Sequence, residues 1–357
     1  MERRWEENIR RVTPYVAGEQ PKEENIIKLN TNECPYPPAP GVREALQNLD
    51  SEKLRLYPDM DAGKLVDALA EHYGVKPEQI FVGVGSDDVL ALAFMTFFHG
   101  EKPILFPDIT YSFYDVWAEV FQIPWELCPL DEQFRICKED YLKPNGGIVI
   151  PNPNAPTGVF AELSVLEEII ASNQDSVVII DEAYIDFGGE SILPLIDKYE
   201  NLLVVQTFSK SRAMAGMRIG FAMADERLIR YLKDVKFSFN SYTMNLPSIE
   251  AGTAAVKDDA YFKEIVGKII ATREWTKEHL ASLGFRFTDT KSNFLFVTHE
   301  SISAEEIFQA LKDAGIYVRY WKKPRISNYL RITVGTDAQM EKLVEFLTNY
   351  IKERKDD

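Results

Sequence analysis

The middle of the chain repeats one pattern, a short apolar run that ends at a turn and is followed by a helical pattern. Such runs span 80–84, 103–106, 147–150, 177–180, 202–206 and 219–223, with helical patterns between them, as at 89–98 and 111–120. A strand that is apolar throughout has both faces covered, and helical crossovers join parallel strands. The pattern therefore predicts an α/β fold with a mostly parallel sheet covered by helices.

The character of the sequence changes after residue 245. Helical patterns run from 246 to about 283, with a break near 257–259. Short strands at 285–287, 294–297, 316–320 and 329–334 then alternate with helices at 304–314 and 338–352. This order predicts a smaller α+β unit, and a length of 357 residues favours about two domains.

Charge and composition exclude several classes of function. With 40 basic and 56 acidic residues the net charge is −16, which disfavours general binding of nucleic acid. Three cysteines without a Cys-x-x-Cys motif, and four scattered histidines, indicate neither disulfides nor a metal site. The N-terminus lacks the apolar core of a signal peptide, and no run is long enough to span a membrane. We expect a cytoplasmic protein without a metal.

Three side chains and one glycine turn lie where ligands bind in open α/β sheets, beyond the carboxyl ends of strands. Asp181 follows the run 177–180, and Lys210 follows the run 202–206 between hydroxyl residues, with Arg218 eight residues on. Without further support, Asp181 could be a residue that merely caps the next turn. Lys210 could be an ordinary solvated lysine, as most lysines are. The turn 83–86 (Gly-Val-Gly-Ser) offers free N–H groups to an anion but lacks the third glycine of a dinucleotide fingerprint.

An amine, a carboxylate and an anion site together match the needs of pyridoxal phosphate. The amine forms a Schiff base with the cofactor, and the carboxylate keeps the ring nitrogen protonated so that the ring accepts charge. The lysine can serve first as anchor and later as general base. Hydroxyls and an arginine near a strand end suit the phosphate.

Motifs along nearly the whole chain resemble those of fold-type I aminotransferases. They are 152–158 (Asn-Pro-Asn-Ala-Pro-Thr-Gly), 181–184 (Asp-Glu-Ala-Tyr) and 209–220, which carries Lys210 and Arg218. More narrowly, 29–36, 56–59 and 330–336 resemble the histidinol-phosphate aminotransferase family. The resemblance implies pyridoxal 5'-phosphate as cofactor and a large domain (30–245) that holds it. A small domain would combine 1–29 with 246–357.

The resemblance also assigns roles to individual residues. Lys210 would be the Schiff-base lysine, Asp181 the partner of the pyridine nitrogen, and Tyr184 the hydrogen-bond donor to the ring hydroxyl. The remaining cofactor contacts would come from Tyr111 stacked on the ring, from Ser86, Asp87, Thr207, Ser209 and Arg218 at the phosphate, and from Tyr57 of the partner subunit. Tyr15 and Asn293 match family positions near substrate. Arg319 and Arg331 lie on two consecutive predicted strands, where they could be surface residues or could form a shared anion clamp for a phosphate and a carboxylate.

Two positions depart from the family pattern. Ala155 stands directly before Pro-Thr-Gly, where the family usually has an Asn that bonds the ring hydroxyl, so either Asn154 takes that role or Tyr184 serves alone. Cys34 replaces a common Asn in the segment 29–36.

The resemblance implies a homodimeric aminotransferase of histidine biosynthesis whose active site is shared between the chains. It would interconvert histidinol phosphate and 2-oxoglutarate with imidazole acetol phosphate and glutamate. A threonine-phosphate decarboxylase and an aromatic amino acid aminotransferase are alternatives on the same fold. A non-catalytic regulator that binds pyridoxal phosphate is a third alternative, and the incomplete glycine pattern disfavours an NAD dehydrogenase.

Overall fold

The computed structural model describes residues 4–16, 18–22 and 25–356. Its centre is a seven-stranded sheet with the strand order β2-β8-β7-β6-β5-β3-β4. The strands are β2 (Ile80–Gly83), β3 (Ile104–Pro107), β4 (Trp125–Cys128), β5 (Gly147–Pro151), β6 (Val178–Asp181), β7 (Leu202–Thr207) and β8 (Gly220–Ala224). Only β8 runs antiparallel to its neighbours in this sheet. The expected α/β fold is confirmed, and β4 is a strand that the sequence pattern did not indicate.

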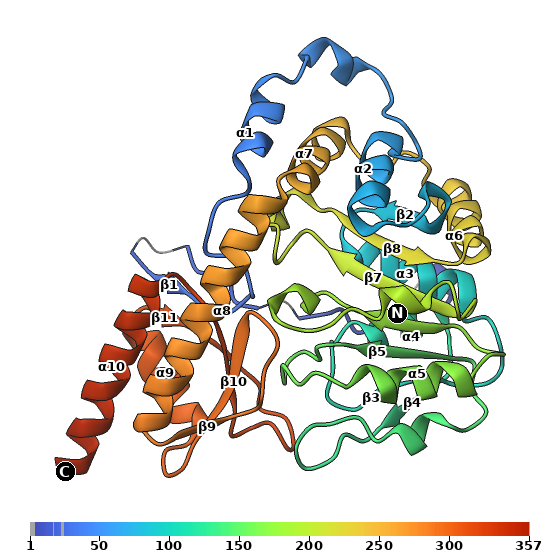
Figure 1. The fold of residues 1–357 in the computed structure, drawn as a ribbon. Helices are drawn as coiled ribbons and strands as arrows, with labels where there is room; N and C mark the ends of the chain where they lie inside the picture. The colour runs from blue at the N-terminus through green and yellow to red at the C-terminus, as the bar shows by residue number, and fades with distance from the viewer. Residues whose placement is uncertain (1–3, 17, 23–24, 357) are drawn as a thin grey trace.

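Helices cover both faces of this sheet (Figure 1). In chain order they are α2 (Gly63–Tyr73), α3 (Ser86–Phe97), α4 (Tyr114–Phe121), α5 (Leu163–Ser172), α6 (Glu226–Phe239) and α7 (Leu246–Lys257), and α1 (Pro40–Gln47) packs against α7. Successive strand residues point to opposite faces. Accordingly, Ile148 and Ile150 of β5 pack in one core cluster with α2, α5 and α7, whereas Val149 packs in the other with α3, α4 and α6. All three are fully buried, which explains why the strand is apolar at every position.

A second group of elements forms from the rest of the chain. It contains β1 (Ile27–Lys28), α8 (Asp259–Ser282), β9 (Phe285–Phe287), β10 (Phe294–His299), α9 (Ala304–Asp313), β11 (Ile316–Tyr317), β12 (Arg319–Tyr320), β13 (Leu330–Thr333) and α10 (Asp337–Asp356). A four-stranded antiparallel sheet has the order β12-β13-β10-β9, and β1 pairs in parallel with β11. Figure 1 shows the long helix α8 running from the central sheet to this smaller unit.

Helices α7 and α8 connect the central sheet to the smaller group of elements. Helix α7 packs against α1 and α2, and its residues Ile249 and Val256 belong to the main core. The change of direction comes at Asp258, whose side chain caps α8 by accepting a hydrogen bond from Tyr261 N. The helical break expected near 257–259 is therefore confirmed.

Short 3₁₀ helices complete the regular structure. They are η1 (Arg4–Asn8), η2 (Ser51–Arg55), η3 (Pro77–Gln79), η4 (Lys138–Tyr141), η5 (Ile185–Phe187), η6 (Leu193–Leu195) and η7 (Ala215–Met217). Across residues 4–16, 18–22 and 25–356, the model contains no helix with the length and hydropathy of a membrane span.

Candidate active site

Two adjoining cavities open beyond the carboxyl ends of the central strands. An inner cavity of about 190 Å³ is lined by residues that include Ser86, Asp87, Asp181, Thr207, Ser209 and Arg218. An outer cavity of about 440 Å³ is lined by residues that include Tyr15, Asn32, Arg319, Trp321 and Arg331. Tyr111, Tyr184 and Lys210 line both. The structure thus brings most of the residues selected from the sequence to one place.

Asp181 is the last residue of β6 and is only 5 % exposed. Its Oδ2 accepts a hydrogen bond of 2.8 Å from the Tyr114 hydroxyl, and its Oδ1 accepts one of 3.2 Å from Ala183 N. Burial raises the pKa of Asp181 to about 6, and the hydrogen bonds from Tyr114 and Ala183 oppose that rise. A cationic ring nitrogen beside this carboxylate would supply the opposite charge that the buried group needs.

Lys210 lies three residues beyond the end of β7, at the junction of the two cavities. Its Nζ donates a hydrogen bond of 3.3 Å to Thr31 O and lies 5.7 Å from the ring centroid of Tyr184. The Tyr184 hydroxyl accepts a hydrogen bond of 2.9 Å from Asn32 Nδ2. A primary amine beside a phenol, at the mouth of a cavity, is suited to react with an aldehyde and to carry a proton.

An anion cradle closes the inner end of the cavity. Helix α3 begins there after Gly85, and no side chain caps its first N–H groups. The Arg218 guanidinium donates to Ser209 Oγ at 3.3 Å and to Asp87 Oδ2 at 3.1 Å, and Thr207 Oγ1 donates to Ser209 Oγ at 3.1 Å. A helix N-terminus, two hydroxyls and an arginine form a donor set that fits a phosphate group.

Glycine is required at position 85 of this cradle. Its φ of 85° is a left-handed conformation, and an added Cβ would lie 2.4 Å from Arg218 Nη2. The turn that the sequence suggested as an anion site therefore lets Arg218 approach the start of α3. The Asp87 carboxylate accepts a hydrogen bond of 2.8 Å from the Tyr111 hydroxyl as well as the one from Arg218, so it positions these two side chains.

Two residues expected at the site lie elsewhere in this protomer. Asn154 does not line the inner or outer cavity. Its Nδ2 donates to Ile109 O at 2.9 Å and to Thr157 Oγ1 at 3.0 Å, and it lines a separate cavity of about 720 Å³. Its Oδ1 is buried and has no hydrogen-bond partner among the described residues, so a cofactor contact by Asn154 stays a prediction. Tyr57 is 81 % exposed and stacks on Tyr242, with ring centroids 4.6 Å apart.

The outer cavity holds three of the four expected substrate residues. Arg319 of β12 pairs directly with Arg331 of β13, and Tyr15 stacks on Phe113 with centroids 4.1 Å apart. Asn293, in contrast, is fully buried and does not line the cavity. Its Nδ2 donates to Asn32 O at 3.0 Å, so Asn293 supports Asn32 from behind instead of lining the cavity.

Sequence reasoning missed two polar contacts of the site. Asn32 lies within a motif that the resemblance singled out, but no role was assigned to its amide. Tyr114 lies in the same aromatic segment as Tyr111, and only the structure shows that its hydroxyl reaches Asp181. Both depend on tertiary packing between segments distant in sequence, and no spacing rule indicates them.

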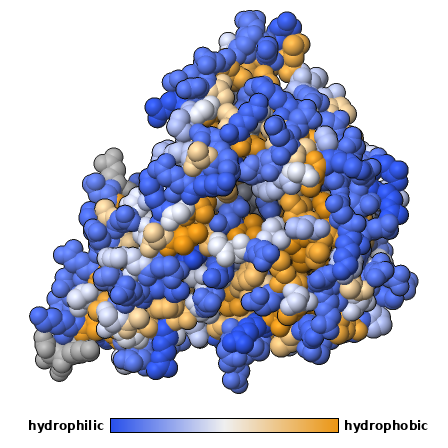
Figure 2. All heavy atoms as spheres, in the orientation of Figure 1, coloured by the Kyte–Doolittle hydropathy of each residue, from blue (hydrophilic) through white to orange (hydrophobic). Residues whose placement is uncertain are grey.

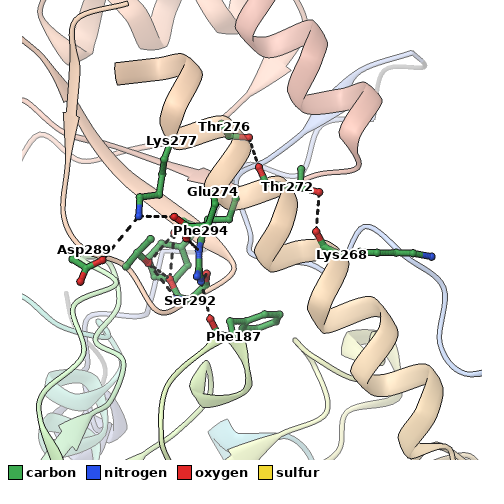
Figure 3. A network of polar contacts seen from close by, with 11 residues as sticks. Phe187, Lys268, Thr272, Glu274, Thr276, Lys277, Asp289, Ser292 and Phe294 are labelled. Atoms are coloured by element: carbon green, nitrogen blue, oxygen red, sulfur yellow. Dashed lines mark hydrogen bonds and ion pairs between the residues drawn. The ribbon is translucent and has the colours of Figure 1, made fainter. Parts of the chain in front are cut away.

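A buried arginine on α8 connects segments on both sides of the site. Figure 3 shows Glu274 and Lys277 of α8 beside Asp289, Ser292 and Phe187. Arg273, only 3 % exposed, donates from Nη1 to Phe187 O at 2.8 Å and to Ser292 O at 2.9 Å. Phe187 lies three residues after Tyr184, and Ser292 directly precedes Asn293, so Arg273 joins the two segments that flank the cavities.

The α/β fold, the lysine after β7, the carboxylate at the end of β6 and the phosphate cradle together define a fold-type I enzyme that uses pyridoxal 5'-phosphate. Among the described residues, no group of three His, Cys, Asp or Glu side chains could hold a metal ion. Residues 24–347 match the family model described as aminotransferase class I and II. The chain therefore belongs to the class I and II aminotransferase family.

The chain is similar to several curated histidinol-phosphate aminotransferases. It is 51 % identical over 351 residues to the one from Lactococcus lactis subsp. cremoris strain SK11, covering 98 % of this chain and 99 % of that one. It is 50 % identical over 345 residues to the one from Clostridium acetobutylicum, covering 97 % and 98 %. The crystal structure of histidinol-phosphate aminotransferase from Sinorhizobium meliloti, in complex with pyridoxal-5'-phosphate, has the same fold, with a TM-score of 0.84 at 22 % identity over 92 % of this chain and 91 % of that one.

Proposed function

We propose that the protein transfers the amino group of histidinol phosphate to 2-oxoglutarate, giving imidazole acetol phosphate and glutamate. The observation that carries the proposal is the pair of facing arginines, Arg319 and Arg331, in the cavity that Lys210 lines. The curated relatives at about 50 % identity support it. A donor with a phosphate and an acceptor with two carboxylates both need an anion site beyond the reacting carbon.

Pyridoxal 5'-phosphate, when bound, supplies an electron sink for the charge that develops on the substrate carbon. Lys210 Nζ would anchor it and later accept the proton from the amino-bearing carbon of the donor. Ionised Asp181 would hold the proton on the ring nitrogen, and Tyr114 keeps that carboxylate in place through its hydrogen bond. Tyr184 would contact the ring hydroxyl, with Asn32 fixing the phenol.

Arg218, Ser209 and Thr207 would bind the cofactor phosphate together with the first N–H groups of α3. Tyr111 would lie against the ring. At the other end, Arg331 would bind the anionic tail of either substrate, because its Nε is buried and makes no hydrogen bond with the described residues. A buried donor without a partner indicates a ligand that supplies an acceptor.

A direct assay tests this proposal. The purified holoenzyme is offered histidinol phosphate, O-phosphothreonine or phenylalanine, each with 2-oxoglutarate, and the products are identified. We expect imidazole acetol phosphate and glutamate from the first donor at the highest kcat/KM. Release of carbon dioxide from O-phosphothreonine, or a preference for phenylalanine, would overturn the substrate assignment.

We further propose a homodimer in which Tyr57 reaches the phosphate cradle of the partner. Tyr57 is exposed and contacts the exposed ring of Tyr242, and Leu54 and Leu56, close to it in sequence, are exposed as well. Apolar side chains also gather near the middle of the face shown in Figure 2, over the sheet. Patches of this kind mark protein interfaces, and C₂ symmetry is the commonest arrangement.

Mixing two inactive variants tests the shared site. Lys210→Ala and Tyr57→Ala chains are refolded together, so that each heterodimer contains one site with both changes and one with neither. Regained activity is expected if Tyr57 acts in the partner's site. Activity that does not rise above the level of the unmixed variants, or a fully active monomer in sedimentation, would refute the shared site.

We also propose a large domain that holds the sheet and a small domain that combines both ends of the chain. The pairing of β1 with β11 supports the small domain, and the packing of α7 on α1 and α2 supports a boundary near residue 258.

We also propose a cytoplasmic location. The free thiols of Cys34, Cys128 and Cys137 support a reducing compartment.

A further inference from the structure

A lysine on helix α6 is buried beside the strand that leads into the phosphate cradle. Lys236 is only 3 % exposed and lines neither cavity of the site. Its Nζ donates a hydrogen bond of 3.0 Å to Val82 O and one of 3.3 Å to Met60 O. Burial lowers the pKa of Lys236, and the charges of Asp88 and Asp61 oppose that fall. None of the proposed catalytic steps uses this ammonium group.

The first of these hydrogen bonds fixes the start of the turn 83–86, which leads from β2 into α3. Val82 O belongs to the peptide unit that joins Val82 to the turn, and because this unit is planar, a bond to its oxygen also orients its N–H group. Two glycines leave the backbone of the turn unusually free to rotate. Within the turn, Val84 N donates a hydrogen bond of 2.9 Å to Asp88 Oδ2. Lys236 and Asp88 therefore restrain a turn that its glycines leave flexible.

The second hydrogen bond reaches the loop that carries Tyr57. Met60 lies three residues after Tyr57, in the segment between η2 and α2. Helix α6 holds this loop a second time, because Lys233, nearly one turn before Lys236, forms an ion pair of 3.1 Å with Asp61. One buried ammonium group thus connects the phosphate turn of its own protomer with the loop that we propose reaches the cradle of the partner subunit.

An ammonium group suits this connection better than an apolar side chain of the same length. It offers three donors, so it can bridge two carbonyls from segments that are distant in sequence. Burying a charge costs free energy. The ring of Phe81, whose centroid lies 5.3 Å from Nζ, attracts the ammonium group and offsets part of this cost. A methionine would fill the same space without the cost, so the bridge between the two carbonyls is what the lysine provides.

We propose that Lys236 is a positioning residue for the cofactor phosphate, which holds the turn 83–86 of its own site and the loop of Tyr57 in one arrangement. It acts through the main chain, by keeping the first N–H groups of α3 directed at the cradle. Because one group restrains both segments, a change in one site is transmitted to the site of the partner subunit. This coupling rests on the proposed shared site, whereas the hold on the turn stands on the hydrogen bond to Val82 O.

Cofactor binding separates this role from a general contribution to stability. The cofactor is removed from the purified chain, and pyridoxal 5'-phosphate, or pyridoxal without the phosphate, is titrated back while the visible absorbance of the bound ligand is followed. We expect Lys236→Met to raise the Kd of pyridoxal 5'-phosphate about tenfold and to change the Kd of pyridoxal by less than about twofold. A lysine that only stabilises the fold would affect both ligands alike, so equal losses, or no loss, would overturn the proposal.

Lys233→Met is the matched control, because it removes the same charge from the same helix. Its ion pair with Asp61 reaches the loop and not β2. Ion pairs between partly exposed side chains contribute little, so both Kd values should stay within about twofold of the wild type. A tenfold loss in this variant as well would assign the effect to charge alone and refute the bridge. Lys236→Gln, which keeps a neutral donor, takes the place of Lys236→Met if that variant does not fold, with the same selective loss expected.

A double-variant cycle tests the link to Tyr57 and separates it from the proposed shared site. If Lys236 acts partly through the loop, Lys236→Met should raise the Kd of pyridoxal 5'-phosphate less in a Tyr57→Phe background than in the wild type. Losses that simply multiply would overturn the link. If Tyr57→Phe alone leaves the affinity unchanged, the shared site is wrong and the link between the two sites fails with it. The selective loss of phosphate binding in Lys236→Met then still decides the role at the turn.

Discussion

Replacing Arg273 by methionine should destabilise the enzyme more than the loss of any exposed arginine. Its guanidinium is buried and donates two hydrogen bonds to main-chain carbonyls, of Phe187 at 2.8 Å and of Ser292 at 2.9 Å. Hydrogen bonds from a charged donor contribute about 1.5–3 kcal/mol each. The contact with Glu274 adds little, because that side chain is 49 % exposed.

The two bonds together contribute about 3–6 kcal/mol, and removing a buried charge offsets part of the loss. We therefore expect a loss of about 3 kcal/mol in the free energy of unfolding. With an m value of about 3 kcal/mol/M, the urea midpoint should fall by about 1 M. Circular dichroism of the holoenzyme in increasing urea measures this midpoint.

Arg286→Met is the matched control, because Arg286 is exposed on the neighbouring strand β9. Exposed substitutions of this kind change stability by about 0.5 kcal/mol or less. Activity should also fall in Arg273→Met, since its two acceptors adjoin the segments of Tyr184 and Asn293. If the midpoint of Arg273→Met falls no further than that of Arg286→Met, the bridging role of Arg273 is wrong.

Three further predictions concern the site itself. Burial raises the pKa of Asp181 from its ordinary 3.8 to about 6, so the folded apoenzyme binds a proton that the unfolded chain releases. The contribution of Asp181 to the stability of the apoenzyme should fall by about 2 kcal/mol as pH rises from 4 to 7, and urea titrations in which Asp181→Asn keeps the same slope would contradict this. Tyr114→Phe removes a hydrogen bond that lowers the pKa of Asp181, so the pKa of Asp181 in the apoenzyme should rise; an unchanged pKa in an NMR titration of the carboxyl group would exclude the effect. Arg331→Ala should slow both half-reactions by roughly ten- to hundredfold in stopped-flow, whereas Arg319→Ala should slow the phosphate donor more than glutamate; equal effects of Arg319→Ala on both would refute a division of labour.

The sequence predicted well the positions of residues that directly follow a strand. Asp181 and Lys210 follow apolar runs, and parallel strands bring their carboxyl ends to one edge, so their proximity followed from the pattern alone. Arg319 and Arg331 lie on two consecutive short strands that the sequence indicated, and these strands pair in the structure. These positions depend on local pattern and on simple rules of sheet topology.

Other contacts depend on packing that no spacing rule describes. Asn154 stands one residue from the family position, and only the structure shows that its Nδ2 donates to Ile109 O. Asn293 lies behind Asn32 because two loops from opposite ends of the chain meet there. Side-chain direction at such junctions follows from tertiary contacts, which sequence periodicity cannot supply.

The parallel pairing of β1 with β11 has a consequence for synthesis of the chain. Ile27 lies beside Ile316, so the strand around Ile27 has no partner until the ribosome has added 316 − 27 = 289 further residues. The central sheet, built from residues 80–224, can form before that point. The strand around Ile27 therefore stays unpaired, and Leu29 stays outside its core cluster, while the central sheet forms. The substrate side of the pocket, which includes the segment around Asn32, is then assembled last.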